Sequence, residues 1–416
     1  MRVAFITSMF PAVSETFILA QVTGLIDLGH QVDIYATRAG DGPVHGDVEK
    51  YHLPARTRYI RDFSTVKGRG ERLARAVGIL LPQVWRDPAS VARWCGVVRA
   101  KGMYEALNLL FKLAPFWAGR YDVIHTHFGP TGGTWIWLKR FTRAPYVCAF
   151  YGYDISSYVE THGREVYREL FAEADAILAL SEHMKLQLTA LGCDPARVVV
   201  HRLGTDPARF AAPSRNGASG EPVEIVSVAR LVEKKGLEYA IRAVAQVVQG
   251  GARLRYRIIG GGPLEPSLRR LINELGLAGT VELLGPQTSD VVTQAMGRAD
   301  IFILPSVTAA SGDQEGTPVS LMEAEAAGVP VVSTRHSAIP ELVLDGESGF
   351  LAEERDVAGL AESLRRLAAD PTLRRRFGAR GRRLIEERHS LPKLNAALAA
   401  LYGRLAARGT TGRGGV

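Results

Sequence analysis

The chain has 416 residues, more than one ordinary hydrophobic core uses, so its length predicts two or three domains. A hydrophobic content of 46% and a charged content of 23% exclude a disordered chain. Its three widely spaced cysteines exclude a disulfide framework or a cysteine-based zinc site, and they predict a reducing cytoplasm. The net charge of +8 is concentrated in one segment.

Apolar runs alternate with helical stretches in the first half of the chain, and the same pattern starts again in the second half. This alternation is typical of parallel sheets covered by helices. The strands predicted in the first half are Val3–Thr7, Gln31–Ala36, Val123–Thr126, Tyr146–Ala149, Ala176–Ala179 and Val198–His201. Those predicted in the second half are Glu224–Val228, Tyr256–Ile259, Val281–Leu284, Ile301–Pro305 and Pro330–Ser333. The fold class is therefore α/β, with two Rossmann-like, doubly wound domains facing a cleft.

The predicted domain limits follow from composition. Residues 1–203 and 223–390 form the two domains, and residues 204–222, rich in Pro, Gly, Ala and Ser, form a linker. Residues 391–405 have an amphipathic helical pattern, and we expect this helix to pack back on the first domain. Residues 406–416 have the composition of a disordered tail.

The positive charge lies between Leu53 and Arg120, where thirteen Lys or Arg face four Asp or Glu. The apolar run Ala76–Trp85 lies inside this segment. Cations beside apolar and aromatic groups suit an anionic membrane surface, and a solvated helical face is the alternative. No nucleic-acid motif accompanies the charge, so nucleic acid is not an expected partner. No apolar run reaches the about 18 residues of a membrane span, which predicts a cytoplasmic protein, peripheral at the inner face of the cell membrane.

Two segments of the second half resemble ligand-binding loops. Arg230 and Lys235 lie between the first strand and its helix, where fixed cations beside a helix N-terminus make an anion receptor. Ordinary surface cations are the alternative reading. Gly260–Gly262 follow the next strand, and their missing side chains let a ligand approach the backbone.

The stretch EGTPVSLMEAEAAG, residues 315–328, has the punctuation of a helix. Thr317 is predicted as the N-cap, Pro318 as the first helical residue and Gly328 as the left-handed stop. Backbone N–H groups of Gly316, Thr317 and Val319 then face a phosphate.

Two carboxylates flank this helix start. Glu315 and Glu323 cannot bind the phosphate and are predicted to accept hydrogen bonds from hydroxyls, whereas Glu325 is expected to point away. The two cations, the helix start and the two acids together describe a site for a nucleoside diphosphate sugar.

These residues also resemble a known family. EGTPVSLME is similar to the E-x7-E motif of the GT-B fold, retaining glycosyltransferases of family 4, the glycosyl transferases group 1. ARLVEKKG and GVPVVSTRHSAIPELVLDGESGFL resemble its neighbouring segments, and the loop TSMFPAVSETFI resembles its colanic-acid and exopolysaccharide branch. The resemblance implies retaining transfer of a hexosyl-type sugar from a nucleotide sugar to a hydroxyl of a glycan or of a polyprenyl-diphosphate-linked acceptor, without metal or other cofactor.

The resemblance also implies roles in the donor site. Arg230 and Lys235 clamp the diphosphate, Glu315 orients the transferred sugar, and Glu323 holds the ribose hydroxyls. The remaining donor-binding residues implied are Gly261, Gly262, Leu284, Gly316, Thr317, Pro318 and Val319.

In the first domain, His125 and His127 end a predicted strand. A His-x-His pair can bind metal, but no third ligand at metal spacing and no Asp-x-Asp motif accompany it. The resemblance makes His127 a catalytic residue that contacts the transferred sugar and leaves His125 buried. Tyr151 stands where relatives commonly have His, and Asp154 is either a site residue or a helix cap.

The loop after the first strand also departs from the family. Many relatives carry a glycine pair there, whereas this chain has Ser14, Glu15 and Thr16. Together with Tyr151 and Asp154, these residues are assigned to the acceptor side of the cleft.

Charge stabilisation by Arg230, Lys235 and the helix start is predicted to replace a metal. Two alternatives remain open: a sugar-nucleotide epimerase on the same architecture, and a catalytically silent adaptor that binds a nucleotide sugar.

Overall fold

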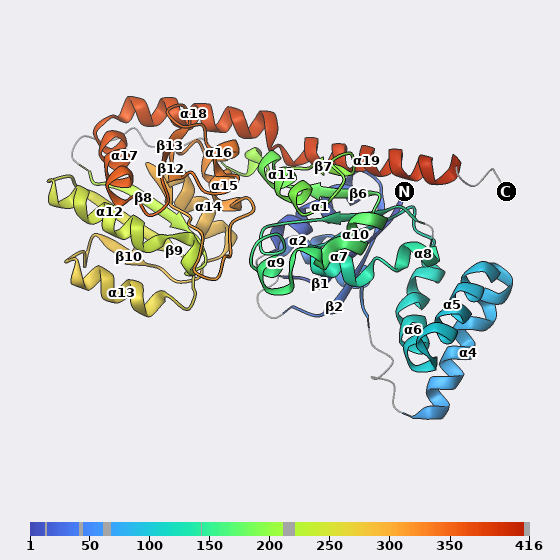
Figure 1. The fold of residues 1–416 in the computed structure, drawn as a ribbon. Helices are drawn as coiled ribbons and strands as arrows, with labels where there is room; N and C mark the ends of the chain where they lie inside the picture. Colours follow the sequence, from blue (N-terminus) through green and yellow to red (C-terminus); the bar gives the residue numbers. More distant parts are fainter. Residues whose placement is uncertain (13–14, 41–44, 61–67, 143, 211–220, 412–416) are drawn as a thin grey trace.

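The computed structural model describes residues 1–12, 15–40, 45–60, 68–142, 144–210 and 221–411. Two sheets lie side by side in Figure 1, each with helices on both faces, and a long helical segment runs along one side of both. No helix among these residues is long and apolar enough to cross a membrane.

The first sheet is wholly parallel, with strand order β3-β2-β1-β4-β5-β6-β7 in the described part of the chain. Its central strands are short runs buried on both faces, which suits a parallel sheet between two helical layers. The strands are β1 (Arg2–Met9), β2 (Gln31–Arg38), β3 (Thr57–Tyr59), β4 (Val123–His127), β5 (Tyr146–Ala149), β6 (Ala176–Ala179) and β7 (Val198–Val200).

The second sheet repeats this topology with order β10-β9-β8-β11-β12-β13, again parallel throughout. The strands are β8 (Val223–Val228), β9 (Leu254–Ile259), β10 (Val281–Leu283), β11 (Ile301–Leu304), β12 (Val331–Thr334) and β13 (Gly349–Ala352). Two Rossmann-like parallel sheets confirm the predicted fold class. The structure adds β3 and β13, which the sequence did not predict, at one edge of each sheet.

Most helices of the first domain cover its sheet. They are α1 (Thr16–Asp27), α2 (Gly46–Lys50), α3 (Leu53–Arg56), α7 (Gly129–Trp135), α8 (Leu138–Thr142), α9 (Ser157–His162), η2 (Arg164–Tyr167), α10 (Arg168–Glu173) and α11 (Glu182–Ala190). The basic segment forms three further helices, which pack on one another and project away from the sheet (Figure 1). They are α4 (Arg69–Arg86), α5 (Pro88–Lys101) and α6 (Met103–Gly119), called here the three-helix unit.

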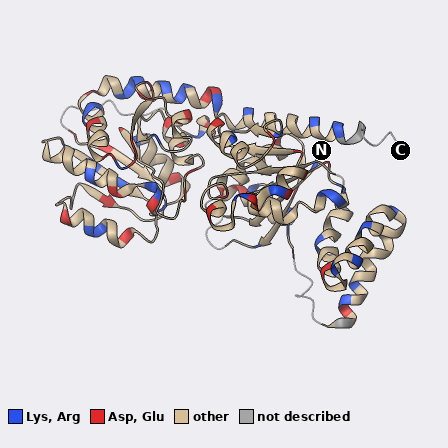
Figure 2. Cartoon of the chain, in the orientation of Figure 1, with Lys and Arg blue, Asp and Glu red and all other residues tan. Residues whose placement is uncertain are grey.

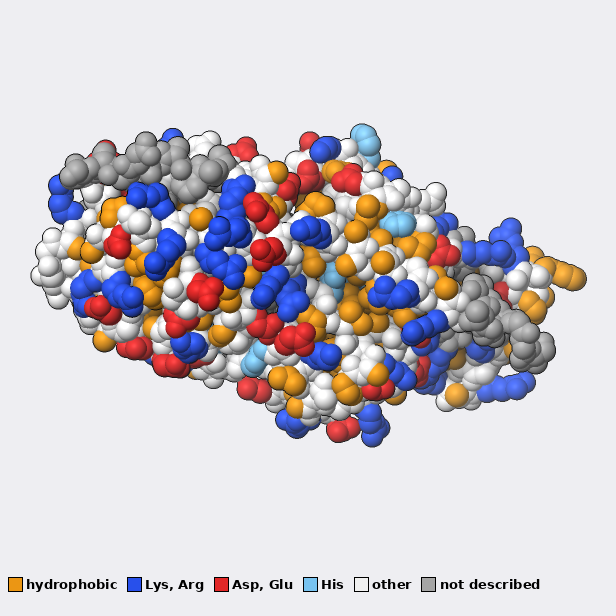
Figure 3. All heavy atoms as spheres, turned by 90° about the horizontal axis from the view of Figure 1, so that it is seen from above, with side chains coloured by type: hydrophobic (Ala, Val, Ile, Leu, Met, Phe, Trp, Pro, Cys, Tyr) orange, Lys and Arg blue, Asp and Glu red, His pale blue; other side chains and the backbone are white. Residues whose placement is uncertain are grey.

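The second domain is covered by α12 (Leu237–Gln249), α13 (Glu265–Glu274), α14 (Ser289–Arg298), α15 (Val319–Ala326), α16 (Ile339–Leu342), α17 (Val357–Ala369) and α18 (Pro371–Arg388), with short η3 (Pro207–Arg209) and η4 (Glu233–Lys235) turns. Arginines line α18 (Figure 2), and Figure 3 looks onto the face that carries them. Several are compensated, since Arg380 pairs with Glu347 and Arg382 with Glu386. These α18 arginines lie outside the basic segment Leu53–Arg120 and are paired on the surface of the second domain.

The chain crosses between the domains twice, and the two crossings lie together. Thr205 N donates to the His389 carbonyl at 3.0 Å, and Leu391 N donates to the Thr205 carbonyl at 3.0 Å. Beyond this point α19 (Leu391–Thr411) runs along the first domain, where it packs against α1 (Figure 1).

Two details of the predicted limits change. The disordered tail predicted from residue 406 is wrong for its first six residues, because α19 continues to Thr411. The predicted linker contains η3, and residues 211–220 within it lie outside the described residues.

Candidate active site

The predicted site residues come from loops at equivalent places in the two sheets. In each sheet the strand order reverses beside the first strand, between β1 and β4 and between β8 and β11. Ligands of doubly wound sheets bind outside the carboxyl ends of the strands at this reversal. His127 ends β4, Arg230 and Lys235 follow β8, and Glu315 lies in the loop between β11 and α15. The topology thus places all four at the expected edges.

Buried polar contacts hold the loop before α15. Lys234 Nζ pairs with the Asp313 carboxylate at 3.0 Å and donates to the Gln314 carbonyl at 3.2 Å. The Glu315 N–H donates to His336 Nε2 at 3.0 Å, which leaves His336 Nδ1 as the donor to Glu354 at 2.6 Å. The Glu315 backbone is therefore fixed from both sides.

The Glu315 side chain forms an ion pair with Lys235, with 2.9 Å between Oε1 and Nζ. Both side chains are nearly buried, at 7% and 13% exposed. Burial acts to raise the pKa of the Glu315 carboxyl, but the positive charges of Lys235 and Lys234 outweigh it and hold the pKa below its ordinary value. The structure thus brings two predicted site residues into contact and keeps Glu315 ionised.

Arg230 lies exposed directly after β8, with no ion-pair partner among the described residues. The glycine turn Gly260–Gly262 packs tightly against the loop that holds Arg230. Leu231 N donates to the Gly261 carbonyl at 2.9 Å, and a Cβ added to Gly262 would lie 2.6 Å from the Leu231 carbonyl oxygen. Gly261 and Gly262 therefore let two loops meet, and Leu284 lies half-buried at the end of β10.

The start of α15 differs from the prediction. Pro318 has extended backbone angles, with φ −68° and ψ 113°, so it occupies the N-cap position and the helix begins at Val319. Thr317 as N-cap is wrong, because its hydroxyl makes no capping bond and is buried without a partner in the described structure. Gly328 has φ +73°, as predicted for the stop. The Gly316–Val319 backbone remains at the mouth of the helix.

The two acids further along α15 have different surroundings. Glu323 is half-buried, and burial raises its pKa to about 7 against the charge of Arg209. Glu325 points into the core between α15 and α18. It is fully buried, its Oε1 accepts a 2.7 Å hydrogen bond from Ser348 Oγ, and burial raises its pKa to about 8.

His127 and Tyr151 form a pair in the first domain. His127 Nδ1 lies 2.6 Å from the Tyr151 hydroxyl, and the rings stack with centroids 6.0 Å apart. Both residues are buried, and burial lowers the pKa of His127 to about 3. Nε2 of His127 has no hydrogen-bond partner among the described residues. His127 is thus a neutral imidazole with one nitrogen unused.

His125 forms a similar pair two residues earlier on β4. Its Nδ1 lies 2.5 Å from the hydroxyl of Tyr402 on α19, and its ring lies 4.3 Å from that of His127. Its burial agrees with the role expected for it.

Asp154 is buried and holds the chain around Tyr151. Its carboxylate accepts from the backbone N–H groups of Gly129, Tyr151 and Gly152 at 3.0, 2.9 and 2.8 Å. These bonds join the start of α7 to the Tyr151 loop, so Asp154 accepts at the start of α7 and not, as the alternative had it, at the start of the helix that follows it.

The loop after β1 is only partly described. Ser14 lies outside the described residues. Glu15 precedes α1 without capping it, and one of its carboxylate oxygens is buried with no hydrogen-bond partner among the described residues. Burial raises the pKa of Glu15 to about 7 against the charge of Arg38. Thr16 begins α1 and is exposed.

The two domains touch at the site itself. A Cβ added to Gly316 would lie 1.6 Å from the Tyr151 carbonyl oxygen, and one added to Gly152 would lie 2.7 Å from Gly316 N. At a second contact, the Glu341 carboxylate of α16 accepts from the N–H groups of Glu182 and His183, at 3.0 and 2.8 Å, at the start of α11. The loop between β11 and α15 that holds Glu315 and Gly316, called here the donor loop, therefore packs directly against the loop that holds Tyr151 and Gly152.

Several supporting residues escaped the sequence reasoning, namely Lys234, His336, Glu354, Gly152 and Glu341. Their signal was present in part. His336 and Glu341 lie in the segment GVPVVSTRHSAIPELVLDGESGFL, which resembled the family, but nothing in the sequence said what each would touch.

Two family models match the chain. Residues 14–204 match a glycosyl transferase 4-like domain, and residues 209–384 match glycosyl transferases group 1. WcaL of Salmonella typhimurium, assigned to colanic acid biosynthesis, is 41% identical over 374 residues, covering 88% of this chain and 90% of that protein. The amylovoran biosynthesis glycosyltransferase AmsK of Erwinia amylovora is 38% identical over 377 residues, covering 88% and 91%.

Solved structures of the same fold cover nearly the whole chain. Anabaena HepE in complex with UDP and glucose has a TM-score of 0.71 at 18% identity and covers 97% of this chain and 100% of that one. Sucrose-phosphate synthase from Thermosynechococcus elongatus has a TM-score of 0.72 at 18% identity and covers 98% and 100%. Sequence and fold agree: the chain belongs to the group 1, family 4 glycosyltransferases of the GT-B fold.

Proposed function

We propose that this glycosyltransferase moves a hexosyl residue from a nucleoside diphosphate sugar to a hydroxyl of a glycan or polyprenyl-diphosphate-linked glycan. It does so with retention of the anomeric configuration and without a metal ion. The Lys235–Glu315 ion pair at the mouth of α15 carries the proposal. It holds a cation and an ionised carboxylate, which can accept from hydroxyls, beside the backbone of Gly316. Arg230, in the same β8–α12 connection as Lys235, has no ion-pair partner among the described residues.

The charges suit a diphosphate leaving group. Negative charge grows on the diphosphate as the glycosidic bond breaks, and Arg230, Lys235 and the N-terminus of α15 stabilise it. Glu315 is ionised and can accept hydrogen bonds from sugar hydroxyls. No described group of three His, Cys, Asp or Glu side chains lies together as a metal site would require.

A donor panel tests this function. Purified protein is incubated with UDP-, GDP-, ADP- and dTDP-hexoses and a polyprenyl-diphosphate-linked oligosaccharide, in EDTA and then with Mg²⁺. We expect the nucleotide sugars of one base to raise the melting temperature of the protein. One sugar should be transferred to the same extent in EDTA and with Mg²⁺. Proton NMR of the new linkage should give the anomeric configuration of the donor. An inverted product, or transfer only with Mg²⁺, would contradict the corresponding part of the proposal.

The same assay separates the two alternatives. An epimerase would convert the donor sugar when no acceptor is present. A silent adaptor would bind the nucleotide sugar and release neither free nucleotide nor product under any condition.

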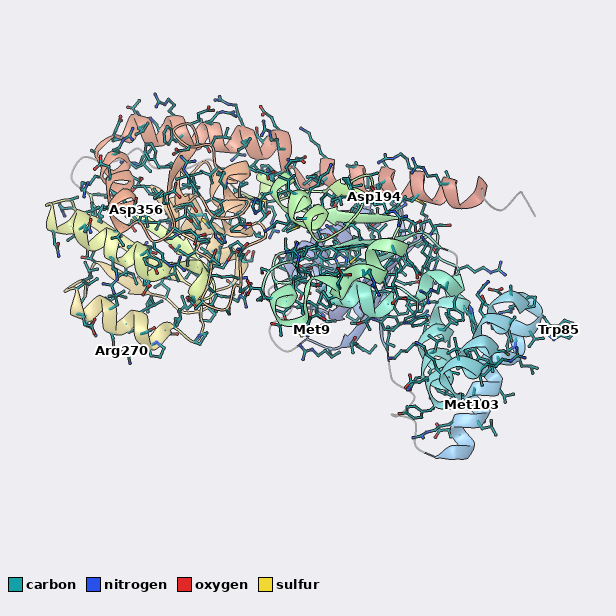
Figure 4. All side chains as sticks on the ribbon, in the orientation of Figure 1. Met9, Trp85, Met103, Asp194, Arg270 and Asp356 are labelled. Carbon is teal, nitrogen blue, oxygen red and sulfur yellow. The ribbon has the colours of Figure 1, made fainter. Side chains whose placement is uncertain are left out.

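The three-helix unit is the second part of the proposal, as a contact with an anionic membrane surface. The outward stripe of α4 is apolar, and Trp85 and Leu81 are 86% and 62% exposed. Trp85 points away from the body of the molecule in Figure 4. The other exposed apolar residues of the stripe, at helical spacing, are Leu73, Val77 and Val84. Arg86 on the same helix provides charge for anionic headgroups, whereas Arg75 is paired with Glu71.

Vesicle sedimentation tests this contact. Wild-type protein should sediment with vesicles of phosphatidylglycerol and phosphatidylethanolamine, and less so as salt is raised. Trp85→Ser with Leu81→Ser should abolish sedimentation, since each buried side chain contributes about 1.5–3 kcal/mol. Leu186→Ser is the matched control, because Leu186 is 70% exposed on α11, outside the three-helix unit. Equal sedimentation of both variants would favour a solvated face.

A further inference from the structure

The Tyr151–His127 pair contains an unused polar atom. Nε2 of His127 is buried and has no partner among the described residues, although buried polar groups in folded proteins are nearly always paired. The ring stands at the carboxyl end of β4, the edge at which ligands of such sheets bind. The aromatic rings that contact the His127 ring are those of Phe5, His125 and Tyr151. The unpaired nitrogen is therefore a place for a ligand atom.

The Tyr151 hydroxyl determines what that nitrogen offers. A buried phenol needs an acceptor for its proton, and among the described residues the only recorded partner of the Tyr151 hydroxyl is His127 Nδ1, 2.6 Å away. The phenol stays protonated because burial raises its pKa well above the ordinary value. If Tyr151 donates to Nδ1, the single proton of the neutral imidazole must sit on Nε2.

We propose that Tyr151 is a positioning residue that fixes His127 as the Nε2–H tautomer, so that this N–H donates a hydrogen bond to an oxygen of the bound sugar. The inference deepens the proposed function and rests on it for the identity of the ligand. A histidine in place of Tyr151 would be less selective, because a neutral imidazole can donate or accept. Tyrosine removes that choice.

The Tyr151 backbone ties this pair to the donor loop. Its N–H is held by Asp154, and its carbonyl oxygen packs against Gly316, the residue after Glu315. The hydroxyl that orients His127 and the backbone that meets the donor loop thus belong to one residue. A sugar between Glu315 and His127 would find an acceptor on one side and a donor on the other.

The His125–Tyr402 pair provides a control within the same protein. Tyr402 and His125 repeat the hydroxyl-to-Nδ1 contact, but Tyr402 comes from α19 and His125 lies two residues further from the end of β4. Tyr402→Phe should therefore alter the tautomer of His125 and leave that of His127 unchanged.

The test is NMR of the full-length protein labelled with ¹⁵N-histidine, with the His127 signals assigned by loss in His127→Asn. We expect Nε2–H in the wild type and a mixture of tautomers in Tyr151→Phe. The kcat of Tyr151→Phe should fall roughly tenfold to a hundredfold, the range for lost orienting partners of functional histidines, with little change in the KM of the donor. Tyr402→Phe should keep kcat within about threefold.

An Nδ1–H tautomer of His127 in the wild type overturns the proposal even if Tyr151→Phe does not fold. So does Tyr151→Phe that keeps both the Nε2–H tautomer and the wild-type kcat. If the wild type transfers no sugar from any donor, the proposed function fails, while the NMR spectrum still decides the tautomer.

Discussion

At the scale of single residues, the site depends on buried charges that compensate each other. Lys235 and Glu315 are nearly buried and pair at 2.9 Å, with Lys234 and Asp313 as a second pair beside them. Removing one member of a buried pair leaves the other as an uncompensated charge, which costs more than the pair contributes. Stability and activity therefore respond differently to changes at these positions.

Lys235→Met should lower transfer by about a hundredfold or more, since it removes a cation that we propose stabilises the leaving group. It should also lower the free energy of unfolding by roughly 3 kcal/mol, because Glu315 is left buried and charged. The double variant Lys235→Met with Glu315→Gln should recover most of the stability and none of the activity. Urea unfolding and initial rates measure the two effects. A double variant as unstable as the single one would contradict the charge argument.

Glu325 predicts a pH effect on stability. Its pKa is about 8 in the folded protein and about 4.3 in the unfolded chain, so the unfolded chain loses its proton first as pH rises. The stability from protonated, buried Glu325 is complete below about pH 4.3 and declines until about pH 8, by an amount on the order of a few kcal/mol. Glu325→Gln should abolish this decline between pH 5.5 and 8.5. If the wild type and Glu325→Gln lost the same free energy of unfolding between the two pH values, the prediction would be contradicted.

At the scale of elements, the sequence predicted what depends on local pattern. Short apolar runs located strands such as β6 and β11, because a strand buried on both faces of a parallel sheet is largely apolar. The polar edge strand β3, Thr57–Tyr59, has no such run, and β13 begins with Gly349. Thr317 failed as N-cap because Pro318 takes an extended conformation and moves the helix start by one residue. Lys235, the partner of Glu315, and Gly129, one of the partners of Asp154, come from distant segments, which no local pattern encodes.

The contact between the donor loop and the Tyr151 loop predicts a sensitive glycine. Gly316→Ala places a Cβ 1.6 Å from the Tyr151 carbonyl oxygen, so the two loops must separate. We expect transfer to fall by about tenfold or more while the melting temperature changes little, and the radius of gyration from X-ray scattering to increase. Gly133→Ala is the control, because its added Cβ meets nothing within 4 Å. Normal activity of Gly316→Ala would show that the contact is not needed for transfer.

At the scale of the whole molecule, the first domain is completed by the end of the chain. Tyr402 of α19 contacts His125, and Asn395 Nδ2 donates to the Ala20 carbonyl of α1 at 3.2 Å. A chain that ends at Ser390 should therefore unfold its first domain at a lower temperature, because α19 no longer covers α1. Calorimetry measures this, and a chain ending at Thr411 should behave as the full protein does. Equal melting of all three would mean that α19 adds no stability.

The chain leaves the first domain at Thr205 and returns to it at His389, so α19 is synthesised after the whole second domain. The ribosome makes the sheet of the first domain, then the whole second domain, and only then α19. At about 5–20 residues per second, the strands of the first domain wait on the order of 10–40 s for the helix that covers α1 and bonds His125. During that interval the nascent first domain exposes the face of α1 that α19 will cover. Chaperone binding in the cell should therefore concentrate on chains that have passed β7 but not yet released α19.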